Sequence, residues 1–346
     1  MSHYFPIPFC KLLFILTLTV TLLGCEKPEQ VQKFNGEAQG TTYHISFWSA
    51  QTADAQALKK AVDAEFSRLD QLLSNYRPDS AIEQLNKTVT SEALPVNNEI
   101  IALIGQARVV SQASNGCYDL TIKPLFDLWG FKDDKLFIPD QASLQATLKE
   151  VGFAKIDVID AGHLRKLNPE LRIDLSSIAQ GYSVTRIARV LEQQGIENYL
   201  VEIGGELQTR GNKPGDEPWR IALEKPLSGE RTMHKVITIG QSEPLAIMTS
   251  GTYRHYFDAD GKRYSHILDA TNGRPVEHHT VSVTVLHADP TQADAWSTAL
   301  LCLGRERGVE AANKAGIAAL FIEQQGEAFN EYNSAPLGAL TKVLIK

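Results

Sequence analysis

The sequence predicts an α+β fold in which helices pack against mixed and largely antiparallel sheets. Several short segments alternate apolar and polar residues, as do the strands of an antiparallel sheet that has one buried face. Longer segments repeat apolar residues at the spacing of an amphipathic helix. Because strands and helices do not follow one another in strict alternation, their order argues against a parallel βαβ series.

These two periodicities place the expected elements along the chain. Asp260 and Gly261 separate two short strand-like segments and predict a tight hairpin turn. We expect strands over residues 41–48, 199–203, 219–223, 236–239 and 281–286, and helices over residues 55–73, 98–111, 143–151, 178–194 and 291–303.

The first residues have the features of a secretory signal. Lys11 precedes an apolar run over residues 12–23, which is too short for an ordinary membrane span. The run ends at Gly24 and Cys25, and this end resembles the lipobox of bacterial lipoproteins, in which the cysteine is acylated. We therefore expect a lipoprotein signal peptide over residues 1–24 and an exported protein, anchored through Cys25 to a bacterial membrane and facing the periplasm. An ordinary signal peptide that happens to contain a cysteine is the alternative.

Composition divides the remaining chain into a tether and a domain. Residues 25–38 are polar and lack periodicity, which predicts a lipidated tether, whereas residues 39–346 form one compositionally even block. Of the four cysteines, Cys117 and Cys302 lie outside the signal and the lipid site. They are far apart in sequence and have apolar neighbours, so we expect buried free thiols rather than a disulfide.

Charge and missing motifs narrow the function classes. The formal net charge of −7 argues against general nucleic-acid binding, which needs a basic face to displace counterions. The sequence also lacks the G-x-G-x-x-G, P-loop and G-x-S-x-G motifs, which weakens the case for a Rossmann enzyme, an NTPase or a serine hydrolase.

A first candidate site lies in IDLSSIAQGYS at residues 173–183. This segment precedes a predicted helix, and the unpaired N–H groups at a helix start attract anionic ligands. Ser177 and Gln180 have the spacing of a capping box, and capping alone also accounts for them. Gly181 favours close approach of another group to the backbone, because glycine within a helix costs about 1 kcal/mol relative to alanine.

Asp294 and Thr298, within ADAWSTAL at residues 293–300, form a second candidate site. They lie one helical turn apart, so a carboxylate and a hydroxyl converge on one point, as a hard cation such as Mg²⁺ requires. Interaction of the aspartate with the helix dipole and back-bonding of the threonine give a purely structural alternative.

His266 is a third candidate, between the predicted hairpin and a loop rich in Gly and Pro. A histidine in this position can reach into a cleft and move protons near neutral pH. Hydrogen bonding within the loop is the structural alternative. The glycines of VEIGGE at residues 201–206 would line the approach to such a cleft.

Together these motifs resemble the ApbE family of flavin transferases. The resemblance runs from about residue 38 to the C-terminus and rests on DLSSIAQGYS, VEIGGE, TSGTYRHYF followed by SHILD and GRP, ADAWSTAL, GCYDLTIKPLFDLWGF and LSNYRPDSAIEQLN. It implies a T-fold-like core with FAD in a cleft between two lobes. The implied activity moves FMN from FAD to a threonine or serine hydroxyl of a target protein and releases AMP.

The resemblance also implies a metal site and an FAD site. Asp294 and Thr298 would bind Mg²⁺ with the backbone carbonyl of Ser177, while Ser297 stands where some members have a further acidic ligand. The residues expected to line the FAD site are Gln39, Tyr76, Cys117, Tyr118, Asp119, Asp174, Gln180 and Leu268.

We assign the proton transfer to His266, which would deprotonate the acceptor hydroxyl or polarise the phosphate, with Asp269 as its orienting partner. The expected acceptors are exported domains of membrane redox complexes, such as flavinylated subunits of Na⁺-translocating NADH:quinone oxidoreductase or of Rnf-type complexes. A Mg²⁺-dependent FAD pyrophosphatase and a non-catalytic FAD-binding lipoprotein are the two alternatives. Tyr76 favours the transferase over the first, and the metal pair disfavours the second.

Overall fold

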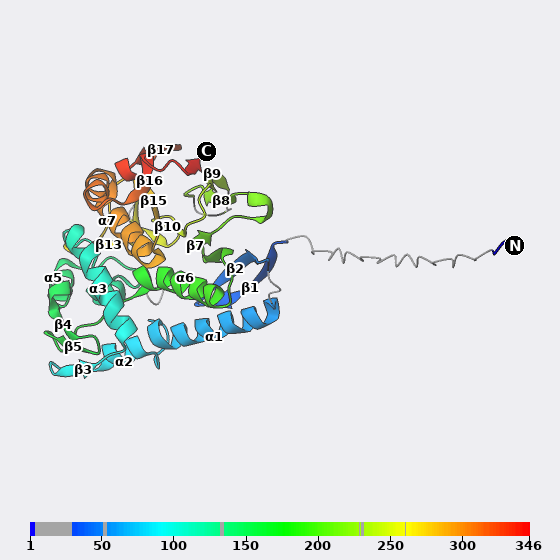
Figure 1. The fold of residues 1–346 in the computed structure, drawn as a ribbon. Coiled ribbons are helices and arrows are strands. Elements are labelled where there is room, and N and C mark those ends of the chain that lie inside the picture. The colour runs from blue at the N-terminus through cyan, green and yellow to red at the C-terminus, as the bar shows by residue number, and fades with distance from the viewer. Residues whose placement is uncertain (4–29, 51–53, 132–134, 228, 230–231, 260) are drawn as a thin grey trace.

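The structure is a computed structural model that describes residues 1–3, 30–50, 54–131, 135–227, 229, 232–259 and 261–346. A central antiparallel sheet carries helices on one face and a small three-stranded sheet on the other (Figure 1). The expected signal peptide and the lipid site at Cys25 lie outside the described residues.

The helices are α1 (Ala55–Leu73), α2 (Ala81–Lys87), α3 (Asn98–Ala113), α4 (Lys123–Trp129), α5 (Gln141–Leu148), α6 (Ser176–Gln193), α7 (Pro290–Ala315) and α8 (Ala335–Gly338). Short polar residues begin several of them. Asp54 caps α1, Ser80 caps α2 and Asn97 caps α3, each through a side-chain oxygen that accepts from a backbone N–H of the first turn. Gly316 ends α7 in the left-handed conformation that glycine adopts most readily.

The strands are β1 (Gln32–Ala38), β2 (Thr41–Trp48), β3 (Ala93–Pro95), β4 (Ile156–Asp160), β5 (His163–Lys166), β6 (Asn198–Ile203), β7 (Glu206–Arg210), β8 (Trp219–Glu224), β9 (Met233–Ile239), β10 (Leu245–Gly251), β11 (Tyr256–Ala259), β12 (Lys262–Ser265), β13 (Leu268–Asp269), β14 (Arg274–Pro275), β15 (Thr280–His287), β16 (Ala318–Gln325), β17 (Ala328–Asn333) and β18 (Val343–Ile345). The central sheet has the order β1-β2-β6-β7-β10-β15-β16-β17, and every neighbouring pair in it is antiparallel. The small sheet on its other face has the order β18-β9-β8.

The helix and strand pattern confirms the predicted α+β class, and several boundaries match closely. The expected helix over residues 55–73 and the expected strand over residues 41–48 coincide with α1 and β2. The expected hairpin is present as the antiparallel pair β11–β12, although Asp260 lies outside the described residues. The last expected helix continues past residue 303, because α7 resumes after a break at Gly304, where φ is 72°.

The folded domain begins earlier than the sequence analysis expects. Residues 32–38, assigned to the tether, form β1 and pair with β2 along their whole length. Phe34 packs edge-on against Phe47, with ring centroids 5.9 Å apart. Polar residues and the small Gly36 and Ala38 dilute the apolar signal of this strand, which is why periodicity missed it.

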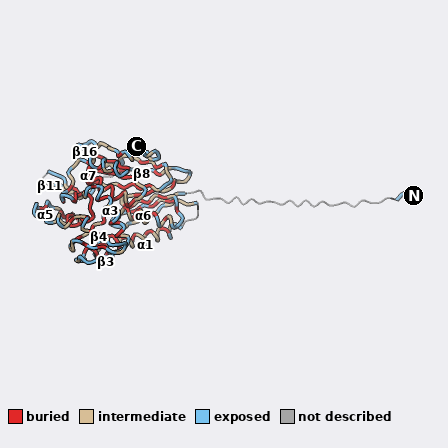
Figure 2. The backbone as a smooth tube through the Cα atoms, turned by 60° about the vertical axis from the view of Figure 1, so that its left-hand side comes forward, coloured by how far each residue is buried: buried red, intermediate tan, exposed pale blue. Residues whose placement is uncertain are grey.

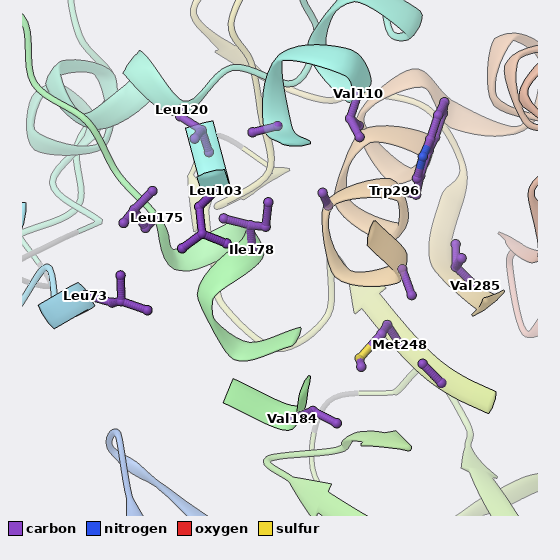
Figure 3. Packing of buried hydrophobic residues seen from close by; sticks show 14 of the residues in the cluster. Leu73, Leu103, Val110, Leu120, Leu175, Ile178, Val184, Met248, Val285 and Trp296 are labelled. Atoms are coloured by element: carbon purple, nitrogen blue, oxygen red, sulfur yellow. The ribbon is translucent and has the colours of Figure 1, made fainter. Parts of the chain in front are cut away.

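Apolar cores lie on both faces of the central sheet, and the buried backbone gathers in the middle of the domain (Figure 2). On the helical face, Leu103 of α3, Ile178 of α6 and Trp296 of α7 belong to one buried cluster (Figure 3). On the other face, the small sheet contributes apolar residues such as Trp219, which pack in one cluster with Ile247 of β10. None of the described helices is long and apolar enough to span a membrane.

A glycine contact sets the distance between α6 and α7, which pack side by side. A Cβ atom added at Gly181 of α6 would lie 2.4 Å from the carbonyl oxygen of Pro290 and 2.5 Å from the Cβ of Asp294. Any side chain at this position would therefore push the two helices apart. Glycine at position 181 costs helix stability, and the close approach of α7, rather than a bound ligand, explains why it is there.

We predict that Gly181→Ala lowers the free energy of unfolding by about 1–3 kcal/mol, because the overpacked contact strains both helices. Gly105→Ala is the matched control, since Gly105 lies within α3 and a Cβ there meets nothing within 4 Å. That control should gain about 0.5–1 kcal/mol. Urea unfolding of both variants measures the difference, and equal stabilities would contradict the close helix contact.

Candidate active site

Most of the predicted site residues line one cavity of about 300 Å³, between the start of α6, α7 and the end of β10. The structure thus brings together side chains that are widely separated in sequence. The predicted residues in its lining are Tyr76, Cys117, Tyr118, Asp119, Asp174, Ser177, Gln180, His266, Leu268, Asp294 and Thr298.

Asp294 is the carboxylate of the predicted metal pair, and it is buried. One of its oxygens accepts a hydrogen bond from Gly181 N at 2.7 Å, which leaves the other to meet a ligand. Burial raises the pKa of Asp294 to about 7. The hydroxyl of Thr298 lies one turn along α7, and it is 3.1 Å from the Ser250 hydroxyl of β10. A carboxylate and hydroxyls therefore converge as the helical spacing predicts.

Glu206 is a second carboxylate of the cavity, and the sequence analysis missed it. It begins β7, and its Oε2 accepts a hydrogen bond from Thr249 N at 3.0 Å. Burial, and then the charge of Asp294, raise the pKa of Glu206 well above its usual range. The two carboxylates repel each other, so a cation between them would be bound favourably. The only sequence signal for Glu206 was its place at the end of VEIGGE, where the two glycines suggested a role for the backbone rather than for a side chain.

The start of α6 differs from the capping box considered as an alternative. Leu175 occupies the N-cap without a side-chain cap, and Gln180 Nε2 donates to Ile203 O at 2.6 Å. Ser177 instead donates its hydroxyl to the Tyr118 oxygen at 3.2 Å. Ser177 and Gln180 therefore connect the helix start to the walls of the cavity.

Ser297 lies outside the lining of the cavity. It is fully buried, and its hydroxyl donates to Asp294 O at 2.9 Å and is 2.7 Å from the Ser250 hydroxyl. A residue held in this way supports the helix turn that carries the metal pair. This geometry does not support Ser297 as a metal ligand.

His266 is held in a state that can accept a proton. Its Nδ1 lies 2.8 Å from the backbone oxygen of His255, so Nδ1 carries the hydrogen and Nε2 keeps its lone pair. Burial lowers the pKa of His266 to about 4, which keeps the ring neutral at physiological pH. Because its side chain lines the cavity, this histidine is placed to remove a proton from a bound hydroxyl.

Asp269 does not act as the orienting partner of His266, so that assignment is wrong. Its Oδ1 accepts hydrogen bonds from the backbone N–H of Thr271 at 2.9 Å and from the Thr271 hydroxyl at 2.5 Å. The carboxylate therefore closes an Asx turn in the loop after β13. The backbone oxygen of His255, which no sequence pattern could indicate, orients the histidine instead.

The Tyr76 loop is tied to the start of α6 by Asn75, which the sequence analysis did not single out. Asn75 Oδ1 accepts from Leu175 N at 2.8 Å, and Asn75 Nδ2 donates to Ile173 O at 3.2 Å. Tyr76 is left 81% exposed at the mouth of the cavity. Its ring can therefore stack on a planar ligand without a change in the loop.

A larger cavity of about 570 Å³ continues from the first one past Tyr76 and Gln180. Gln39 lines it, and its Nε2 donates to the Ser183 hydroxyl at 2.9 Å. The predicted FAD residues are thus divided between two adjoining cavities, which suits a long dinucleotide better than a compact ligand. Asp119, at the wall of the first, is held by Thr121 and Phe153 N.

Cys117 and Cys302 form a disulfide, with their Cα atoms 6.0 Å apart, so the expectation of free thiols is wrong. Both cysteines line the cavity, and the bond joins the loop before Tyr118 to the helix that carries the metal pair. Their separation of 185 residues hid this proximity, because a contact so distant in sequence leaves no local pattern. Disulfides are typical of exported proteins.

A cavity in which two carboxylates, hydroxyls and a neutral histidine meet beside a helix start is typical of enzymes that transfer phosphoryl-type groups. The chain belongs to the ApbE family, whose family model matches residues 39–321. An FAD:protein FMN transferase of Salmonella typhimurium (strain LT2) is 36% identical and aligns over 94% of this chain and 95% of its own length. An FAD:protein FMN transferase of Vibrio cholerae serotype O1 is 38% identical and aligns over 93% of this chain and 96% of its own length.

Structural comparison gives the same family. The flavin transferase ApbE from Vibrio cholerae superimposes with a TM-score of 0.81 at 36% identity and covers 90% of this chain and 99% of its own. The apo flavinyl transferase ApbE of Pseudomonas stutzeri also has a TM-score of 0.81, at 35% identity, with 90% and 97% covered. These likenesses confirm the predicted family and its fold.

We predict that Asp294→Asn stabilises the protein without divalent cations at pH 8. The folded pKa of Asp294 is raised to about 7 from 3.8, so its contribution to stability is lost as pH rises through this window. Removing the charge should raise the melting temperature at pH 8 by at least about 2 °C in EDTA. Added Mg²⁺ should then raise the melting temperature of the unmodified protein only. A variant that melts below the unmodified protein in EDTA would contradict the buried charge.

Proposed function

We propose that this protein is a Mg²⁺-dependent FAD:protein FMN transferase. It transfers FMN from FAD to a serine or threonine hydroxyl of an acceptor protein and releases AMP. Membership in the ApbE family supports this activity, as do the names of relatives that align over most of the chain. The observation that carries the proposal is the pairing of Asp294 and Glu206 in one cavity with the neutral His266.

His266 is proposed to start the reaction by accepting the acceptor hydroxyl's proton at Nε2. The hydroxyl oxygen then forms a bond to the phosphorus of the FMN half of FAD, while the bond from that phosphorus to the bridging oxygen breaks. AMP leaves with the bridging oxygen. The fixed Nδ1 contact with His255 O keeps the ring oriented throughout, so no rearrangement of the base is required.

The residues around Asp294 fit a Mg²⁺ ion. Asp294, Glu206 and Thr298 supply only oxygen donors. Burial raises the pKa values of both carboxylates, and the charge of Asp294 raises that of Glu206 further, so a cation would offset the cost of ionising them there. The backbone carbonyl of Ser177 lies on the helix turn beside them and would complete the protein's share of ligands. When bound, Mg²⁺ supplies positive charge that stabilises the phosphate oxygens during P–O cleavage.

FAD is proposed to span the two adjoining cavities, with its pyrophosphate near the start of α6. Backbone N–H groups at that helix start favour the negative charge of the phosphates. Tyr76 and Tyr118 offer ring faces beside the same region, one exposed at the mouth and one buried in the wall. Gln39 and Gln180 line the larger cavity, where their amides can hydrogen-bond a ring edge or a ribose.

Export and lipid anchoring form a second part of the proposal. The signal-like N-terminus with Cys25 at its end supports acylation there, on the periplasmic side of a bacterial membrane. The Cys117–Cys302 disulfide supports an oxidising compartment. Flavinylated subunits of Na⁺-translocating NADH:quinone oxidoreductase or of Rnf-type complexes are the proposed acceptors, because their exported domains share this compartment.

The activity is tested by incubating the protein with FAD, Mg²⁺ and the purified soluble domain of such an acceptor subunit. We expect the acceptor's mass to increase by one FMN unit, with one AMP released for each modified acceptor. Free FMN and AMP with unmodified acceptor would contradict the transferase and favour the pyrophosphatase. Intact FAD that stays bound would favour a carrier.

We predict that His266→Ala slows FMN transfer by about 10²–10⁴-fold, the usual contribution of a general base. Its affinity for FAD, measured by flavin fluorescence, should stay within about threefold of the unmodified protein. His163→Ala is the matched control, because His163 lies on the exposed side of β5, outside both cavities. Transfer at the unmodified rate by His266→Ala would exclude it as the base.

If Cys25 is the acylated residue, Cys25→Ser removes the thiol that carries the lipid. We predict that this variant no longer incorporates radiolabelled palmitate and leaves the membrane fraction. The substitution leaves the folded domain unchanged, so the transferase assay on the isolated variant serves as its control. Labelling of the variant at the unmodified level would contradict acylation at Cys25.

A further inference from the structure

A third cavity adjoins the one that holds Asp294 and His266, here called the reaction cavity, on the face of the central sheet that carries the small sheet. Its volume is about 340 Å³, and it shares Gly204, Thr249 and Arg254 with the reaction cavity. Its floor is formed by side chains of β2, β6, β7, β10 and β15. The proposed roles of FAD, Mg²⁺ and His266 leave this cavity unused, although it leads directly to the reacting groups.

Strand β8 borders this cavity with its edge rather than its face. Five consecutive residues, 220–224, line the cavity. Successive side chains of a strand point to opposite faces, so consecutive residues border one space only where the backbone edge is turned toward it. β8 ends the order β18-β9-β8, which leaves that edge without a neighbouring strand among the described residues.

The hydrogen bonds of β9 show which groups of β8 face outward. Val236 of β9 exchanges two backbone hydrogen bonds with the C-terminal residue beside β18. Neighbouring residues of an antiparallel strand alternate in direction, so Ile237 faces β8, where it pairs with Ile221. Arg220 and Ala222 therefore direct their backbone N–H and C=O groups away from β9, toward the cavity.

The two cavities meet at Gly204, Thr249 and Arg254, and this junction is called the Gly204 passage. Gly204 and Gly205 add no side chain to it, and the Arg254 guanidinium lies beside them, with Nη1 3.4 Å from Gly204 O. Both glycines have positive φ, 59° and 100°, which glycine adopts most readily. A Cβ added at Gly204 would lie 2.6 Å from Gln180 Nε2, so a larger residue would disturb the reaction cavity. A narrow group such as a serine or threonine side chain could reach through this passage.

Polar groups surround the β8 edge. His44 lies 2.7 Å from Glu202, and Arg254 lies 3.4 Å from Glu224. Hydrogen-bonding side chains in the lining, together with an unpaired strand edge, suit an extended polypeptide, whose main chain both donates and accepts hydrogen bonds.

We propose that the acceptor protein adds an extended segment to the edge of β8, and that this pairing places its hydroxyl beside His266 through the Gly204 passage. The inference rests on the proposed transferase function, and it describes how the enzyme binds its protein substrate. Main-chain pairing supplies affinity without requiring one particular sequence, and the narrow passage selects a small hydroxyl side chain.

Ala222→Pro tests this pairing, because proline removes the outward N–H at an edge position where a strand tolerates it. With the soluble acceptor domain used above, we expect kcat/KM for the acceptor to fall by about tenfold or more, whereas the Kd for FAD stays within about twofold. Asn333→Pro is the control: Ser334 donates its N–H to Ala319, so Asn333 faces outward from a different sheet edge, that of β17. This control should transfer FMN like the unmodified protein.

Hydrogen exchange on the unmodified protein gives an independent readout if Ala222→Pro folds poorly. Addition of the acceptor domain should slow exchange of the amides of Arg220 and Ala222. Normal acceptor kinetics in Ala222→Pro, or unchanged exchange of these amides during productive transfer, would overturn the strand-edge inference but leave the proposed transferase function standing. No FMN transfer by the unmodified protein would overturn the proposed function and this inference with it.

Discussion

Gly181 donates its backbone N–H to Asp294 at 2.7 Å because α6 and α7 approach each other without a side chain between them. This one contact joins the helix start proposed to face the phosphates to the carboxylate proposed to bind the metal. It also holds Asp294 in the interior, where desolvation raises its pKa and makes a cation favourable. Because Thr298 and Cys302 also lie on α7, their distance from the start of α6 depends on the same contact.

The central sheet gives the site two approaches. On one side, the adjoining cavity past Tyr76 and Gln180 offers room for a dinucleotide, while on the other the edge of β8 borders a separate cavity. The first shares Tyr76 and Gln180 with the reaction cavity, and the second shares Gly204 and Arg254 with it. Two substrates that enter from different directions need not compete for space, and the bond between them forms only where both cavities meet. This arrangement explains why a protein acceptor and a nucleotide donor can be bound together.

The sequence predicted the elements with clear periodicity and the residues that lie within distinctive motifs. α1 was placed to the residue because its apolar residues recur at helical spacing, and β2 because its residues alternate. Asp294 with Thr298 was found from helical spacing. β10 was missed because its first four residues are all buried, which removes alternation. Glu206, the disulfide and the contact of His266 with His255 O depend on tertiary proximity, which sequence spacing does not encode. The error at Asp269 has the same cause, since a carboxylate three residues from a histidine can close a turn instead.

The central claim is that the paired carboxylates hold the metal beside the reacting phosphates. Replacing Mg²⁺ with Mn²⁺ and collecting anomalous diffraction from crystals of the FAD complex tests it most directly. The account predicts one strong anomalous peak within coordination distance of Asp294 and Thr298, at the end of the cavity nearest Glu206. A peak elsewhere, or none at a Mn²⁺ concentration that supports activity, would contradict it.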